Sequence, residues 1–139
     1  MKKIEKIKTI KVIDELTKVR TKKKRELTRK FNQAHIIKFD GTEYKISNEL
    51  VEKWHRFYDM AGNEKLTTVT FNLEAKDGTT IPMKFDLSSA NIFIIKVTAY
   101  LYKLENAYYE MQRLLNLFTK PDTLNRVKVN EGFPSILKI

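Results

Sequence analysis

The sequence contains no cysteine, only two histidines and only four glycines among its 139 residues. Without cysteine the chain has no disulfide framework and no thiolate nucleophile, and the usual zinc sites lack their ligands. The glycines lie too far apart to form a phosphate-cradling loop. These absences remove the commonest catalytic motifs, and we therefore expect a non-enzymatic protein without a cofactor or a metal ion.

Long apolar runs are also missing. The longest uninterrupted one, "IFII", covers residues 92–95, whereas a helix needs roughly 20 apolar residues to span a bilayer. The first residues are basic but no apolar stretch follows them, so the start does not resemble a secretory signal. Apolar residues make up 42% of the chain, which is typical of a globular protein. We expect a cytoplasmic protein that does not associate with membranes.

Positive charge is abundant, and most of it lies at one end of the chain. Residues 1–32 hold 13 of the 27 lysines and arginines but only 4 of the 17 acidic residues, so they account for +9 of the net charge of +10. Such a dipolar distribution favours an anionic partner more than a uniformly basic composition does. We predict a basic N-terminal segment over residues 1–32 and a single α+β domain over residues 33–139.

The first predicted hairpin covers residues 35–46, where Asp40-Gly41 interrupts two alternating runs. This dipeptide is the strongest short-range signal for a two-residue hairpin loop. The loop would pair Phe39 with Thr42 and Ile37 with Tyr44, and these side chains would share one face of the sheet. The register is therefore consistent with a single buried face.

The second predicted hairpin covers residues 67–85 and needs a loop of three residues. Only a loop at residues 76–78 places the apolar residues of both strands on one face, with Gly78 in a left-handed conformation. Pro82 has no backbone N–H to donate, so its strand is expected at a sheet edge. Together the two hairpins predict one antiparallel sheet.

Each hairpin precedes a predicted helix. The shorter helix covers residues 48–61, between a Ser-Asn cap and Gly62. The longer one covers residues 89–119, between Ser88-Ser89 and Pro121, and its apolar residues recur at heptad spacing. Because this helix would be about 45 Å long, it carries more apolar surface than one sheet face covers. We predict a homodimer through a seam of seven residues: Val97, Leu101, Leu104, Tyr108, Met111, Leu115 and Phe118.

The conformation of the basic segment is less clearly encoded. Its isoleucines and valines over residues 4–19 scatter around a helical wheel and form no stripe. "TIKVI" instead suggests a short strand, and "RELTRKFNQAHIIKF" suggests a long strand that enters the first hairpin as a basic ribbon. A helix over residues 17–33 is the alternative.

One enzymatic motif can be recognised. Metal-dependent nucleases often combine an acidic-x-Lys triplet on a strand with a second carboxylate upstream. The chain has "EAK" at residues 74–76 with Asp59 upstream, and "EYK" at residues 43–45 with Asp40 upstream. Both triplets border hairpin turns, where Glu and Lys are common for solubility alone, so we do not expect a nuclease.

The basic segment favours nucleic acid as the partner. Lysine outnumbers arginine, which indicates attraction to phosphates without base reading. We predict a sequence-non-specific protein that prefers single-stranded DNA over duplex DNA or RNA. An inhibitory module that docks on an acidic protein partner, such as a phage-encoded antagonist, is the alternative. The composition, rich in lysine, isoleucine and asparagine, is typical of AT-rich phage or plasmid genomes. The predicted binding residues are Lys18, Arg20, Lys22, Lys23, Lys24, Arg25, Arg29 and Lys30.

Overall fold

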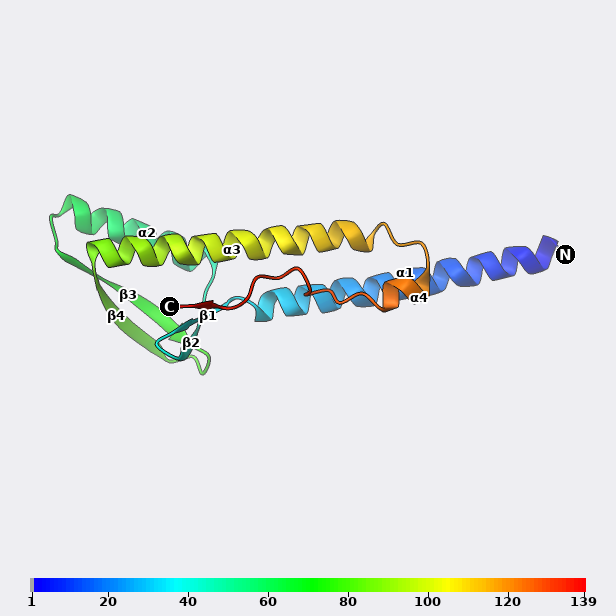
Figure 1. Cartoon of the computed structure of the whole chain (residues 1–139), viewed down its shortest axis with the longest axis horizontal. Coiled ribbons are helices and arrows are strands. Elements are labelled where there is room, and N and C mark those ends of the chain that lie inside the picture. The colour runs from blue at the N-terminus through cyan, green and yellow to red at the C-terminus, as the bar shows by residue number, and fades with distance from the viewer. Residues whose placement is uncertain (1) are drawn as a thin grey trace. The chain divides into compact units, whose positions relative to one another are not determined.

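The basic segment forms one long helix, α1 (Lys2–Gln33), in the computed structural model (Figure 1). The structure describes the backbone of residues 2–139 and the side chains of residues 10–139, so the side chains of four of the predicted basic segment's lysines lie outside the described part. The strand predicted at "TIKVI" is wrong. The long strand predicted over "RELTRKFNQAHIIKF" is wrong for its first nine residues, which belong to α1, whereas its last four residues form strand β1 (Ile36–Phe39). The alternative helix over residues 17–33 forms as part of α1.

The missing apolar stripe of α1 has a physical explanation. Ile10, Val12 and Ile13 are all exposed. Because this part of the helix does not bury one of its sides, its apolar residues need not fall on a single side. Residues 2–33 contain neither glycine nor proline and are rich in lysine, which is a good helix former. Local propensity therefore favours the helix where amphipathic periodicity is absent.

The chain is divided into two compact units. Unit 1 comprises Met1–Gln33 and Glu105–Phe133, and unit 2 comprises Ala34–Leu104 and Pro134–Ile139. Residues 105–133 therefore belong to the same unit as α1. The long helix α3 (Leu87–Leu115) contributes its first part to unit 2 and its last part to unit 1.

Unit 2 is an α+β unit with a mixed five-stranded sheet. The strand order is β4-β3-β2-β1-β5, and β5 pairs with β1 in parallel. The prediction of a purely antiparallel sheet is therefore wrong, because a strand of two residues near the end of the chain leaves no recognisable pattern in the sequence. The strands are β1 (Ile36–Phe39), β2 (Thr42–Lys45), β3 (Thr68–Ala75), β4 (Thr80–Asp86) and β5 (Leu137–Lys138).

Residue pairing between neighbouring strands follows the expected register. Ile37 lies opposite Tyr44 in β1 and β2, and Leu73 lies opposite Ile81 in β3 and β4. The turns contain the expected left-handed residues, with φ of +80° at Gly41 and +88° at Gly78. β4, which carries the proline at position 82, is an edge strand.

The helices begin and end close to their predicted bounds. Helix α2 (Asn48–Asn63) starts after Ser47, whose Oγ accepts a hydrogen bond of 3.1 Å from the N–H of Leu50. Helix α3 starts at Leu87, two residues before the predicted residue 89, because Asp86 caps it by accepting from the N–H of Ser89 at 2.7 Å. It ends at Leu115 rather than at residue 119. The proline at position 121 then begins the short helix α4 (Pro121–Asn125).

The predicted self-association seam is buried within the chain itself. Val97, Leu101 and Leu104 are at most 2% exposed in unit 2, and Leu115 is fully buried in unit 1. Tyr108, Met111 and Phe118 are partly buried against the core of unit 1, which consists of Leu27, Leu115, Leu124 and Val129. Self-association stays a prediction, but these residues are already covered. Among the described residues, no helix combines the length and apolarity needed to cross a bilayer.

Candidate nucleic-acid interface

The apolar residues of α1 define its inward face in unit 1. Leu27 is fully buried, and Leu16 and Val19 pack against the same core. Residues at positions i, i+3, i+4, i+7, i+8 and i+11 share one side of a helix, so this spacing fixes the rotation of α1 about its axis. Because the rotation is fixed, it also decides where each lysine and arginine of the segment points.

Arg20 points inward and caps the end of α3. Its Nε donates to the carbonyl oxygen of Leu115 at 3.0 Å, and a terminal guanidinium nitrogen donates to the carbonyl oxygen of Phe118 at 2.7 Å. The last carbonyl groups of a helix have no partner within the helix, and a cation there also complements the helix dipole. Arg20 was predicted to contact nucleic acid, but in the structure it holds unit 1 together.

Lys23 also serves the fold. Its Nζ donates to the carbonyl oxygen of Val127 at 2.8 Å and lies 3.8 Å from a carboxylate oxygen of Glu26. The Lys23 side chain is only 12% exposed, so it is poorly placed to reach a phosphate. Two of the eight predicted binding residues are thus engaged inside unit 1.

Four of the predicted residues form a row on the opposite, outward face of α1. Lys18, Lys22, Arg25 and Arg29 are separated by four, three and four residues, which places them within an arc of about 60° at 100° per residue. The row is about 16 Å long at a rise of 1.5 Å per residue. All four side chains are exposed. We call this row the outward cationic row.

Most of the outward cationic row is uncompensated by acidic groups. Lys18 lies 3.2 Å from a carboxylate oxygen of Asp14, one helical turn away. Within the described part of the chain, Lys22, Arg25 and Arg29 take part in no ion pair and no side-chain hydrogen bond. Exposed ion pairs are weak, so Lys18 can exchange its partner readily. The row therefore presents its positive charge to solvent.

The remaining two predicted residues, Lys24 and Lys30, lie to the sides of the row. Each is about 100° or more around the helix from its centre, and each is partly buried. They add positive charge to the flanks of α1. The eight predicted residues thus separate into an outward row of four, two flanking lysines and two inward residues.

The three aromatic residues near the basic segment in the sequence, Phe31, Phe39 and Tyr44, do not form exposed stacking platforms. Phe31, the aromatic residue of α1, packs edge-on against Tyr108 with ring centroids 4.1 Å apart. Tyr44 is only 3% exposed, and Phe39 packs edge-on against Phe93. Single-strand binders combine cations with exposed rings on which bases stack. The geometry of α1 supports contacts with phosphates and gives no support to base stacking.

The two acidic-x-Lys triplets pair with each other across β2 and β3. Tyr44 lies opposite Ala75, so each glutamate faces the lysine of the other triplet. Lys76 Nζ lies 2.6 Å from Glu43, and Lys45 Nζ lies 3.6 Å from Glu74. The hydrogen bond from Lys76, aided by its charge, lowers the pKa of the Glu43 carboxyl below its ordinary value. The triplets act as reciprocal cross-strand ion pairs, which explains their presence without catalysis.

The other carboxylates of the nuclease motif do not join this cluster. Asp59 lies 3.9 Å from His55 on the exposed side of α2. Across the residues that the structure describes, no three histidines or carboxylates gather in a way that would hold a metal ion.

No protein-family model, no curated protein and no solved structure matches this chain. The candidate interface therefore rests on the geometry of α1 alone. Sequence reasoning missed the division of the cations between two faces. The signal was present in the spacing of Leu16, Val19 and Leu27, which marks the inward side once the segment is read as a helix.

Proposed function

We propose that this protein binds nucleic acid without sequence specificity through the outward cationic row of α1: Lys18, Lys22, Arg25 and Arg29. The observation that carries the proposal is the alignment of four exposed cations along one face, three of them without an acidic partner in the described structure. Successive members are about 4.5–6 Å apart along the helix axis, so neighbouring cations can meet neighbouring phosphates of one strand.

Binding through this row would be electrostatic. Each cation that meets a phosphate releases condensed counterions, and this release provides the affinity. Lysine ammonium groups contact phosphates without a fixed geometry, and the two arginines can additionally form bidentate contacts. Neither kind of phosphate contact depends on the base, so the proposed binding does not select a particular nucleotide sequence.

The preference for single-stranded DNA belongs to the same proposal, in which binding itself rests on phosphate contacts alone. Phe31 is packed against Tyr108 and does not offer its ring to a base. The strand preference is measured as the ratio of the affinities for single-stranded and duplex oligonucleotides at one salt concentration. The salt dependence counts the phosphate contacts, because each neutralised phosphate contributes about 0.9 to the slope on duplex DNA and about 0.7 on a single strand. Four phosphate contacts would give a slope of about 3.6 on duplex DNA and about 2.8 on a single strand.

The test is a salt titration of a variant that lacks the row. Lys18, Lys22, Arg25 and Arg29 are changed together to Gln, and binding to random single-stranded and duplex oligonucleotides is measured by fluorescence anisotropy. The logarithm of the affinity should fall linearly with the logarithm of salt concentration for the unchanged protein. The slope should decrease by about 2.8 on the single strand for the variant.

A matched control removes four cations elsewhere. Lys53, Arg56, Lys65 and Lys84 are exposed in unit 2, and their change to Gln lowers the net charge by the same amount. This control should keep the full slope. Equal losses in both variants would show that net charge alone drives binding, and an unchanged affinity in the row variant would contradict the proposal.

An acidic protein as the partner of the same row is a distinguishable outcome. Such a partner has no condensed counterion atmosphere, so its affinity would not follow the linear dependence expected for phosphates. Oligonucleotides would then bind no better than inert polyanions of equal charge. That result would replace the proposed function with the alternative of an inhibitory or protein-binding module.

A further inference from the structure

The first part of α3 presents a second heptad stripe to solvent, on a different side from the buried seam. Ile92, Ile95 and Tyr102 are 54%, 57% and 66% exposed, and Ala99 between them is exposed as well. The steps of three, four and three residues keep these four side chains on one face. Three large apolar side chains exposed in one row are unusual on a surface without a partner.

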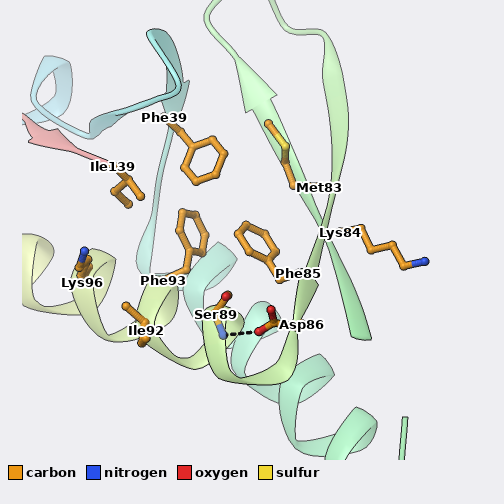
Figure 2. Close-up of a pocket in the computed structure, with 10 residues that line it drawn as sticks. All are labelled: Phe39, Met83, Lys84, Phe85, Asp86, Ser89, Ile92, Phe93, Lys96 and Ile139. Atoms are coloured by element: carbon orange, nitrogen blue, oxygen red, sulfur yellow. Dashed lines mark hydrogen bonds between the residues drawn. The ribbon is translucent and has the colours of Figure 1, made fainter. Parts of the chain in front are cut away.

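A pocket of unit 2 adjoins this stripe at Ile92. It has a volume of about 440 Å³, and Phe39, Phe85 and Phe93 form its apolar wall. Figure 2 shows the three rings turned toward one another, with Ile139 opposite and with Ile92 and Lys96 on neighbouring turns of α3. The Phe85 and Phe93 rings stack at 4.9 Å between centroids within this wall. A pocket of this kind accepts one large apolar side chain of a partner.

Charge on one flank of the stripe indicates what the partner carries. Lys96 and Lys103 are seven residues apart and so lie on the same flank of the helix. In the described part of the chain, neither lysine forms an ion pair or a side-chain hydrogen bond. The other flank is occupied by the neutral side chains of Asn91 and Thr98. Lys96 and Lys103 therefore make one flank of the apolar stripe cationic, and the pocket beside this flank is lined by Asp86 as well as by Lys84 and Lys96.

This charge pattern disfavours a second copy of the chain. In an antiparallel pair of helices, equivalent flanks face each other, so the flank with Lys96 and Lys103 would face the same flank of its copy. In a parallel pair, Lys103 would meet Thr98 and gain no charge partner. Carboxylates opposite the two lysines would instead form ion pairs at the rim of the contact.

We propose that this surface, formed by the exposed stripe of α3 and the pocket beside Ile92, docks an amphipathic helix of a partner protein. The partner helix carries an apolar stripe, one aromatic anchor residue for the pocket and acidic residues along the flank that faces Lys96 and Lys103. This is the helix-in-groove mode, in which anchors at heptad spacing provide affinity and flanking charges provide specificity. The surface lies in unit 2 and does not depend on the nucleic-acid row of α1.

The direct test uses a designed peptide of about three heptads, labelled with fluorescein and titrated with the full chain in anisotropy. The acidic probe has leucines at the stripe positions, one tryptophan as anchor and glutamates along the flank. A second probe has lysines in place of the glutamates, and a third has alanine in place of the tryptophan. The acidic probe should bind at least about tenfold more tightly than either of the others. The lysine probe loses the charge match with Lys96 and Lys103, and the alanine probe loses the anchor residue in the pocket.

Variants of the chain locate the site. Lys96→Glu with Lys103→Glu should reverse the preference, so that the lysine probe becomes the better ligand, and Ile95→Lys should weaken both probes. The control Lys53→Glu with Arg56→Glu makes the same change in net charge on α2 and should leave the preference intact. Because these positions are exposed, the variants should fold like the unchanged protein, and circular dichroism checks this.

The outward cationic row is a competing site for an acidic probe, and the experiment separates the two. The variant with Gln at Lys18, Lys22, Arg25 and Arg29 should still bind the acidic probe with unchanged affinity. Loss of binding in that variant, or equal affinity for the acidic and lysine probes, would overturn the proposal. Formation of a dimer that Ile95→Lys abolishes would also overturn it, in favour of a second copy.

Discussion

A terminal guanidinium nitrogen of Arg20 donates a hydrogen bond of 2.7 Å to the carbonyl oxygen of Phe118, just beyond the end of α3. The same side chain reaches the carbonyl oxygen of Leu115 through its Nε. One arginine from the basic segment thus satisfies two carbonyl groups near the last turn of a distant helix. This relationship separates the structural cations of α1 from those that face solvent.

Replacing Arg20 should therefore destabilise the fold. Arg20→Met keeps the aliphatic bulk but removes both donors, and we expect a loss of about 1–3 kcal/mol in the free energy of unfolding. Arg20→Lys should recover only part of it, since an ammonium group cannot reproduce the planar fork. Urea denaturation followed by circular dichroism measures the loss. Lys22→Met, on the exposed face, is the control and should change the free energy of unfolding by less than about 0.5 kcal/mol. Equal losses at both positions would contradict the structural role of Arg20.

The cap of α3 predicts a pH dependence of stability. The N–H of Ser89, followed by the hydroxyl of Ser88, donates to the Asp86 carboxylate and lowers the pKa of that group. The folded pKa lies below the unfolded value of about 3.9, so the charged cap contributes its full stability above that pH. This contribution is lost as the pH falls through the folded pKa.

The measurement compares melting temperatures of the unchanged protein and Asp86→Asn as a function of pH. Asparagine can still accept a hydrogen bond but carries no charge, so the variant should melt a few degrees lower near neutral pH. The difference should shrink toward zero as the pH falls well below 3.9. A difference that stays constant over the whole range would show that the charge of Asp86 has no role.

Two glycines should respond in opposite directions to alanine. Gly78 has φ of +88°, a conformation that costs an L-residue about 1–2 kcal/mol, so Gly78→Ala should destabilise by about that amount. Gly62 lies inside α2 without a positive φ, and Gly62→Ala should be neutral or stabilising by up to about 1 kcal/mol. An added Cβ would meet no atom within 4 Å at either position, so backbone conformation alone decides the sign. Thermal unfolding of both variants checks it, and the same sign at both would be the contrary result.

Self-association remains a prediction, and its surface has to lie outside the buried seam. Exposed apolar residues are available on α1, where Ile10 and Ile13 are 64% and 58% exposed and share one face. We expect a dimeric mass in light scattering at tens of micromolar protein, and Ile10→Asp with Ile13→Asp should convert it to a monomeric mass. A monomeric mass of the unchanged chain at that concentration would contradict self-association altogether.

Local patterns in the sequence were sufficient to predict the hairpins and α2, because residues close together in the chain determine these elements. Asp40-Gly41 and the alternation on both sides of Gly78 predicted residue pairs that the structure contains, because shifting the register by one residue would turn the apolar side chains outward. The capped stretch after Ser47 likewise predicted α2 to within two residues of its end. These features depend on contacts within about twenty residues.

The tertiary structure decided what depends on residues far apart in the sequence. β5 joins the sheet only because the end of the chain reaches β1, and a strand of two residues has no pattern of its own. The heptad seam of α3 was predicted as a dimer surface, whereas the structure covers these residues with other parts of the same chain. The charge of residues 1–32 was evident from composition, yet the direction of each cation was not. Leu27 and its neighbours rotate α1 so that Arg20 and Lys23 bond to carbonyl groups about a hundred positions away, and Lys22, Arg25 and Arg29 are left facing solvent.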